Sequence, residues 1–264
     1  MSTVALRQPK LKVTQARVMK SEWIKFWSLR STVITLAISV AVFIGIGLLA
    51  SSMVGDGAGD GRGPDLNGPV GASLAGVGLA QLAFATLGVL FMAGEYSTGM
   101  IRSSLSAVPK RLPVLWAKIA VFSGVVFIIA LVAAAVAFTG GQAIADAGAS
   151  WSDPGVARAV IGSAFVLTGS GVLGIGLGAL LRSTPAAIST VLGVLFLLSG
   201  IAGLLLPDSW SSVVQYFPSN AATSITTVTA TDGSLGPWAG LTVFVGYLVA
   251  VVGAGAWRLK RADA

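Results

Sequence analysis

Residues 117–139 read AKIAVFSGVVFIIALVAAAVAFT, and stretches of this type decide the fold of the chain. Apart from one lysine near its start, the run carries no charge, and it is as long as the roughly 20 helical residues that cross a hydrocarbon core. Five further stretches share this character. The sequence therefore predicts an all-α integral membrane protein with six spans, at Thr32–Val54, Val70–Gly94, Ala117–Thr139, Ala159–Leu181, Pro185–Leu206 and Pro237–Trp257.

The overall composition also indicates a membrane protein. The 264 residues are 55% hydrophobic and only 10% charged, whereas about a quarter of the residues of a soluble domain are charged. We expect a tail with an interfacial helix at residues 1–31, the six-span domain at 32–257 and a second tail at 258–264. No cleavable signal peptide is expected, because about thirty mostly polar and basic residues precede the first apolar run.

The placement of lysine and arginine predicts the orientation, because short loops that carry these residues stay in the cytoplasm. All but two of the 17 basic residues fall on one predicted side, and the exceptions are Arg62 and Arg158. Most acidic residues fall on the other side, namely Asp56, Asp60, Asp65, Asp146, Asp153, Asp208 and Asp232. Both termini are therefore expected in the cytoplasm. This asymmetry accounts for the net charge of +7 without a nucleic-acid partner.

The segment ahead of the first span, Lys12–Leu29, has an amphipathic pattern. Trp23, Phe26 and Trp27 line one face of the predicted helix, while basic residues line others. Aromatic rings beside lysines are typical of a helix that lies in the headgroup layer. The alternative is an aromatic and basic belt that merely anchors the first span.

The connection between the second and third spans, Glu95–Arg111, has the pattern of a short amphipathic helix. Ile101, Leu105 and Val108 recur at helical spacing and predict one apolar face. Because a few polar residues would suffice to connect two spans, we interpret this face as a docking surface for a soluble partner.

The ends of this short helix have their own signals. Ser97 or Thr98 is expected to cap its start, and Pro109 to stop it. Glu95 lies where the second span ends. It either caps the short helix, pairs with Arg102 or faces water.

The chain lacks residues that several classes of enzyme require. The chain has no cysteine and no histidine, which excludes disulfides, cysteine nucleophiles and histidine general bases. No phosphate-binding G-x-x-x-x-G-K-[ST] loop occurs. We therefore expect no catalytic, cofactor-binding or metal-binding residues, and no ATP hydrolysis by this chain alone. No Asp, Glu, Lys or Arg lies deep within any of the six predicted spans. We therefore expect no buried ionisable group there, which argues against an ion-coupled carrier.

One glycine pattern invites a nucleotide-binding interpretation. Residues 169–174 match G-x-G-x-x-G, but they lie inside a predicted span without a βαβ unit, so the match is coincidental. Gly171, Gly174 and Gly178 are better explained as small residues that let two membrane helices pack closely.

The longest predicted outer connection, residues 207–236, mixes aromatic residues with serines and threonines. It is either a flexible connection or a gate that dips partly into the membrane, and the aromatic residues favour the gate.

Taken together, these features resemble the permease subunits of type-2 ABC exporters. Ser21–Thr32 (SEWIKFWSLRST) is similar to the interfacial segment that runs into the first span of that class, and Gly94–Arg111 (GEYSTGMIRSSLSAVPKR) is similar to its coupling helix. Six spans with cytoplasmic termini and a long last outer loop complete the resemblance. The bacterial subfamily with separate ATPase and permease chains fits best, because no nucleotide-binding domain is fused.

The resemblance implies a transporter in the bacterial plasma membrane, built from two six-span permeases and two cytoplasmic ATPase subunits. The second permease would be another copy of this chain or a paralogue, and ATP and Mg²⁺ would bind in the ATPase. The residues that the resemblance assigns to coupling are Glu95, Tyr96, Thr98, Gly99, Ile101, Arg102, Leu105, Val108, Pro109, Lys110 and Arg111.

Two other classes of function remain open at this point. A six-span secondary carrier or channel is the main alternative, and a non-transporting scaffold or sensor subunit is the third class. An ATPase gene beside the gene for this chain would favour the exporter.

Overall fold

The computed structural model describes residues 14–57, 68–108, 111–146, 149–205, 211–228 and 233–261. Within these residues every regular element is helical. Six helical stretches of the described chain are long and apolar enough to cross a membrane, at Arg30–Val54, Gly68–Ser97, Leu112–Ala145, Val156–Leu181, Thr184–Ile201 and Pro237–Arg261. The predicted all-α architecture with six helices able to span a membrane is therefore confirmed.

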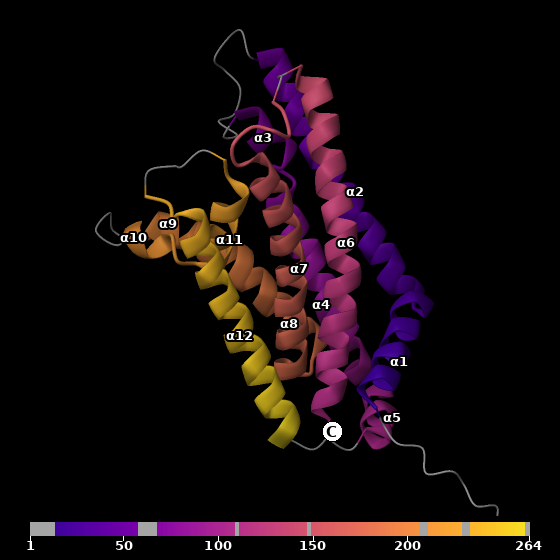
Figure 1. Ribbon diagram of the computed structural model, residues 1–264. Coiled ribbons are helices and arrows are strands. Elements are labelled where there is room, and N and C mark those ends of the chain that lie inside the picture. The colour runs from indigo at the N-terminus through magenta and orange to yellow at the C-terminus, as the bar shows by residue number, and fades with distance from the viewer. Residues whose placement is uncertain are drawn as a thin grey trace, which may run out of the picture.

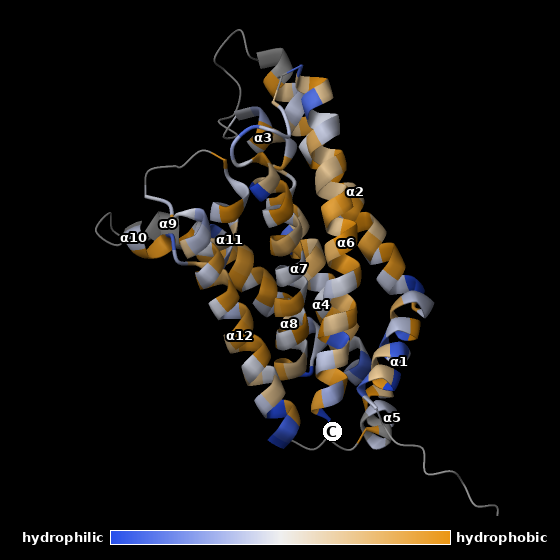
Figure 2. Ribbon diagram, viewed as in Figure 1, coloured by the Kyte–Doolittle hydropathy of each residue, from blue (hydrophilic) through white to orange (hydrophobic). Residues whose placement is uncertain are grey.

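The long helices form one elongated bundle (Figure 1). Its main members are α2 (Arg30–Gly57), α4 (Val77–Ser97), α6 (Leu112–Ala145), α7 (Val156–Leu181) and α12 (Pro237–Arg261). Helix α7 is central, because 78% of its apolar segment is buried, against 22% for α2 and for α12. Figure 2 shows hydrophobic residues along the length of the bundle and hydrophilic ones gathered toward its ends. This pattern is typical of a bundle whose sides contact lipid.

Basic connections meet at one end of the bundle, where the short helix α5 (Met100–Ala107) and the C-terminal end of α12 lie (Figure 1). Arg111 donates a hydrogen bond to the carbonyl of Leu259, and Arg182 donates one to the carbonyl of Arg258, each at 3.5 Å. The loops that the sequence assigns to the basic side thus lie together. Which side of the membrane they face stays a prediction.

Two of the spans are interrupted. Helix α3 (Gly68–Ser73) is separated from α4 by a turn at residues 74–76, within the glycine-rich half of the predicted second span. The fifth span consists of α8 (Thr184–Leu192), a π-helical segment at Gly193–Leu197 and α9 (Leu198–Leu205). A π-helical segment loosens the regular hydrogen-bond ladder, and here the carbonyl of Leu195 accepts a hydrogen bond from Ser219.

The long connection before the sixth span contains α10 (Ser211–Val214) and α11 (Pro218–Thr226). Helix α11 packs against α7 and α12 and buries Ala221, Ala222 and Ile225. The alternative of a flexible connection therefore does not apply to α11, which is part of the bundle. Its depth in the membrane stays a prediction.

Glycines of α7 permit its close approach to α4. A β-carbon on Gly174 would overlap the carbonyl oxygen of Ala85, and one on Gly178 would lie 3.1 Å from the β-carbon of Met92. A β-carbon on Gly171 would overlap an aromatic ring of α6. All three glycines thus lie at helix–helix contacts, where membrane bundles use small residues.

Candidate functional site: a buried ring of charges beside α5

Four charged side chains form a closed ring inside the bundle. Glu22 and Lys25 belong to α1 (Gln15–Ser28), Glu95 lies in the last turn of α4, and Lys118 lies in the second turn of α6. Lys118 Nζ is 2.7 Å from Glu22 Oε2 and 2.8 Å from Glu95 Oε1. Lys25 Nζ is 2.9 Å from Glu22 Oε1 and 2.9 Å from Glu95 Oε1. Acid and base therefore alternate around the ring, which we call the charge ring.

The charge ring is shielded from solvent. The side chains of Lys118 and Glu22 are each 1% exposed, that of Glu95 is 5% exposed, and that of Lys25 is 23% exposed. Burying a charge is costly unless an opposite charge and hydrogen bonds compensate it. The two carboxylates and two ammonium groups supply this compensation and leave the ring with no net charge.

Three phenylalanine rings pack beside the charge ring. Phe26 of α1 lies 5.4 Å from Phe91 of α4, and Phe91 lies 5.9 Å from Phe122 of α6, between ring centroids. Lys118 Nζ also lies 4.4 Å from the centroid of the Phe91 ring. A cation over an aromatic face gains electrostatic attraction. The same three helices that supply the ring thus also share an aromatic contact.

One residue of α1, Phe26, lies in a different environment from the one predicted. Phe26 is fully buried, so its assignment to a face in the headgroup layer is wrong. Trp23 and Trp27 are 50% and 44% exposed, and their place at the membrane surface stays a prediction. The apolar stripe of α1 is shared between the bundle and the surroundings, a division that spacing alone does not reveal.

The ammonium group of Lys25 connects α5 to the ring. It donates a hydrogen bond to Ser104 Oγ at 3.0 Å, in addition to its two carboxylate contacts. Burial lowers the pKa of Lys25, but hydrogen bonds and Coulombic attraction from Glu22 and Glu95 more than offset this, so the pKa lies above its ordinary value of 10.5. Lys25 is therefore an ammonium ion at physiological pH.

Two of the three expectations for Glu95, that it faces water or caps α5, are wrong. It does not face water, because the residue is 4% exposed, and its carboxylate pairs with the lysines of α1 and α6 and does not cap α5. The side chain of Arg102, the expected ion-pair partner, lies outside the described residues, so this pairing stays a prediction. The lysine partners are distant in sequence, so the local pattern around Glu95 does not predict them.

Ile101 and Val108 attach α5 to the bundle. They are 3% and 8% exposed and belong to the main hydrophobic core. The expectation that they face outward toward a partner is therefore wrong. The side chain of Leu105, and Pro109 and Lys110, lie outside the described residues. Among the described side chains of this segment, the exposed ones are small: Ser97, Thr98, Gly99, Ser103 and Ser106.

The start of α5 also differs from the prediction. The hydroxyls of Ser97 and Thr98 each donate to the carbonyl of Gly94 at 2.9 Å, so they complete the end of α4. The residue before α5 is Gly99, whose φ of +73° is in the left-handed region. Glycine adopts this conformation without a steric cost, which allows the chain to turn sharply between α4 and α5.

Two further residues of the predicted coupling segment contact neighbouring connections. The guanidinium of Arg182 lies 5.4 Å from the ring centroid of Tyr96, and Arg111 reaches the end of α12 as described above. The segment from Glu95 to Arg111 thus contacts α1, α6 and the ends of α7 and α12.

Three residues of the charge ring, Glu22, Lys25 and Lys118, are not among the site residues predicted from the sequence. Lys118 is the one charge in the run 117–139, and Glu22 is the one acid in α1; these were the available signals. The expectation that the spans bury no ionisable group is wrong, because Lys118 and Glu95 lie within the helical stretches Leu112–Ala145 and Gly68–Ser97.

The arrangement is suited to mechanical connection. Among the described residues no group of three or more His, Cys, Asp or Glu side chains has the geometry of a metal site. The ring instead joins α1, α4 and α6 through paired charges, and Ser104 adds α5. Breaking one pair would leave a charge without its partner in a dry site, so these elements are held to one another.

Comparison with known proteins adds no identification. No family model matches the sequence, and no curated protein matches it.

Proposed function

We propose that this chain is the permease subunit of an ATP-driven exporter of the type-2 ABC class, with ATP hydrolysis in a separate cytoplasmic subunit. The observation that carries the proposal is the connection of the short helix α5 to three helices of the bundle through the charge ring. A permease driven by a soluble motor needs an element of this kind, because force applied at the surface must reach the spans.

The contacts suggest how such a force would be transmitted. A displacement of α5 would act on Lys25 through Ser104 and on Glu95 through the Gly99 turn. Both residues are tied to α6, Glu95 directly by Lys118 and Lys25 through the carboxylate of Glu22. Because α6 runs the length of the bundle (Figure 1), its far end would move with α5. A second permease subunit would complete the translocation path.

We assign the contact with the ATPase to the exposed polar edge of the coupling segment, which we call the α5 edge. It consists of Ser97, Thr98 and Gly99 in the turn and of Ser103 and Ser106 on α5. Ile101 and Val108 then act as anchors that transmit movement of the helix to the bundle. Small side chains on this edge would allow close approach of a partner groove.

Purification from native membranes tests this assignment. We expect Mg²⁺-dependent ATP hydrolysis to purify with a tagged chain in mild detergent. Ser103→Trp and Ser106→Trp place a large side chain on the α5 edge and should lower the purified ATPase activity about tenfold, which is a loss of about 1.4 kcal/mol in partner binding. The amount of chain in the membrane should not change, since neither residue lies in a span.

Ser152→Trp is the matched control. Ser152 is also an exposed serine, in the connection between α6 and α7 at the opposite end of the bundle. It should retain wild-type ATPase activity in the same preparation. Full activity in both α5 variants, or equal loss in the control, would contradict the docking assignment.

A proton- or sodium-coupled carrier is the second candidate, and one observation favours it. Lys118 and Glu95 are buried ionisable groups in membrane-crossing helices, and such groups often serve ion-coupled transport. However, the charge ring is internally neutral and lies at one end of the bundle. Reconstituted alone, the chain should show no uptake driven by a proton or sodium gradient. Gradient-driven uptake would favour the carrier over the exporter.

A further inference from the structure

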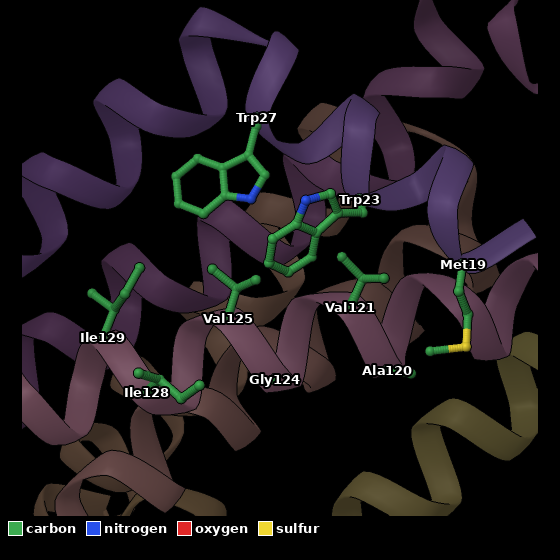
Figure 3. Close-up of a pocket in the computed structure, with 9 residues that line it drawn as sticks. All are labelled: Met19, Trp23, Trp27, Ala120, Val121, Gly124, Val125, Ile128 and Ile129. Atoms are coloured by element: carbon green, nitrogen blue, oxygen red, sulfur yellow. The ribbon is translucent and has the colours of Figure 1, made fainter. Parts of the chain in front are cut away.

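An apolar groove of about 430 Å³ lies between α1 and α6. Figure 3 shows Trp23 and Trp27 of α1 above Val121 and Val125 of α6, with Gly124 on the α6 side. None of its nine lining residues is charged. The volume falls within the range of about 300–1,000 Å³ that is typical of ligand sites.

The groove belongs to the outer surface of the bundle. Ile128, one of its lining residues, is 64% exposed, and Val132 and Val136 continue the same face of α6 with 58% and 46% exposure. Residues four apart lie above one another on a helix, so these three form an apolar stripe. An exposed apolar stripe on a helix able to span a membrane is suited to contact with lipid, and the groove is continuous with it.

The groove also lies beside the first charge-free turns of α6. No charged residue occurs between Ile119 and Ala145, whereas Lys118 precedes this stretch as a member of the charge ring. One end of the groove is therefore near charged groups and the other extends along the apolar stretch. A phospholipid has the same arrangement, with a charged head and an apolar chain.

Helix α1 supplies groups suited to a phospholipid head. Lys20 is exposed and lies three residues before Trp23 and seven before Trp27, which places all three toward the same side of α1. Lysine attracts anionic headgroups, and indole N–H groups are typically found at the membrane surface. The rim is thus cationic and polar, while the interior of the groove is apolar.

We propose that the groove binds one acyl chain of an anionic phospholipid from the adjacent leaflet, with the phosphate beside Lys20. The proposal goes beyond the exporter function and does not depend on it. A bound chain would fill the groove between α1 and α6, the two helices that the Glu22–Lys118 ion pair also joins. Lipid occupancy would therefore set the separation of the two helices, which the charge ring joins to α5.

Gly124 offers a direct way to fill the groove. A β-carbon at this position meets no atom within 4 Å, so Gly124→Leu would extend into the groove without displacing the backbone. Gly246 on α12 is equally open and is not among the lining residues. Gly246→Leu therefore makes the same chemical change away from the groove. Ala120→Leu, at a second lining position, guards against a folding defect in one variant.

The test is native mass spectrometry of the delipidated full-length chain, titrated with phosphatidylglycerol. We expect one saturable binding event in the wild type and in Gly246→Leu, and at least about tenfold weaker binding in Gly124→Leu and Ala120→Leu. Lys20→Gln should weaken phosphatidylglycerol binding but leave phosphatidylcholine binding unchanged.

Three results would overturn the proposal. The first is the absence of saturable phosphatidylglycerol binding to the wild type. The second is wild-type affinity in both groove-filling variants. The third is efficient disulfide cross-linking of Gly124→Cys between two copies in membranes, which would show that protein covers the groove; the chain has no other cysteine to confuse this measurement.

Discussion

Lys118 is, with Glu22, one of the two most buried members of the charge ring. Its side chain is 1% exposed, and it contacts one carboxylate from α1 and one from α4. Removing one partner of a buried ion pair leaves an uncompensated charge, whereas removing both partners is often tolerated. The ring is therefore expected to depend on charge balance more than on any single residue.

Lys118→Met should destabilise the protein by about 3–5 kcal/mol, because Glu22 and Glu95 would then share only Lys25. The double variant Glu95→Gln/Lys118→Met removes one charge of each sign and should recover much of this loss. Unfolding midpoints of the purified protein in detergent measure both effects. Wild-type stability of Lys118→Met would show that the ring does not act as a unit. The same conclusion would follow if the double variant lost as much stability as Glu95→Gln and Lys118→Met lose separately, added together.

The contribution of Lys25 to stability depends on pH, and its raised pKa fixes the direction of this dependence. Because its pKa is raised in the folded protein, its stabilising contribution is complete below the unfolded value of 10.5 and is lost as pH rises through the folded value. The difference in unfolding midpoint between the wild type and Lys25→Met should thus stay constant from about pH 7 to 9 and shrink only above about 10.5. A difference that vanishes near neutral pH would contradict the ionic role of Lys25.

Among the elements, long apolar helices were predictable and their contacts were not. Residues 117–139 can only be buried in protein or lipid, so their helix follows from composition. The charge ring escaped prediction because Glu22 and Lys118 are 96 residues apart in sequence. Spacing likewise identified an apolar face on α5, but it does not reveal whether that face meets a partner or, as for Ile101 and Val108, the chain's own core.

The contact between α7 and α4 gives a prediction at the level of elements. Gly174→Leu would force side-chain atoms into the backbone of α4 at Ala85 and should cost about 1–3 kcal/mol or more. Gly246→Leu, where a side chain meets open space, should stay within about 0.5 kcal/mol of the wild type. Unfolding midpoints measured in parallel compare the two. Equal stability of these variants would contradict close packing at Gly174.

For the whole molecule, the distribution of basic residues predicts the orientation in the membrane. This orientation can be measured without background labelling, because the chain contains no cysteine. Cysteines introduced at Ser152 and Ser212 should react with a membrane-impermeant maleimide in intact cells. A cysteine at Ser103, on α5, should react only after permeabilisation. All three positions are exposed. Labelling of Ser103→Cys in intact cells would show that α5 lies outside the cytoplasm, which would contradict the predicted topology.

The central claim is that a soluble ATPase acts on the spans through α5 and the charge ring. The most direct measurement is the maleimide labelling rate of Ser212→Cys, in the connection before the sixth span, in the purified complex with and without Mg²⁺-ATP. We expect ATP to change this rate, and we expect the change to disappear in Glu95→Gln/Lys118→Met although the ATPase stays bound to the intact α5 edge. The claim would be contradicted if ATP left the labelling rate of Ser212→Cys unchanged while the bound ATPase hydrolysed ATP. It would also be contradicted if ATP still changed this rate in Glu95→Gln/Lys118→Met.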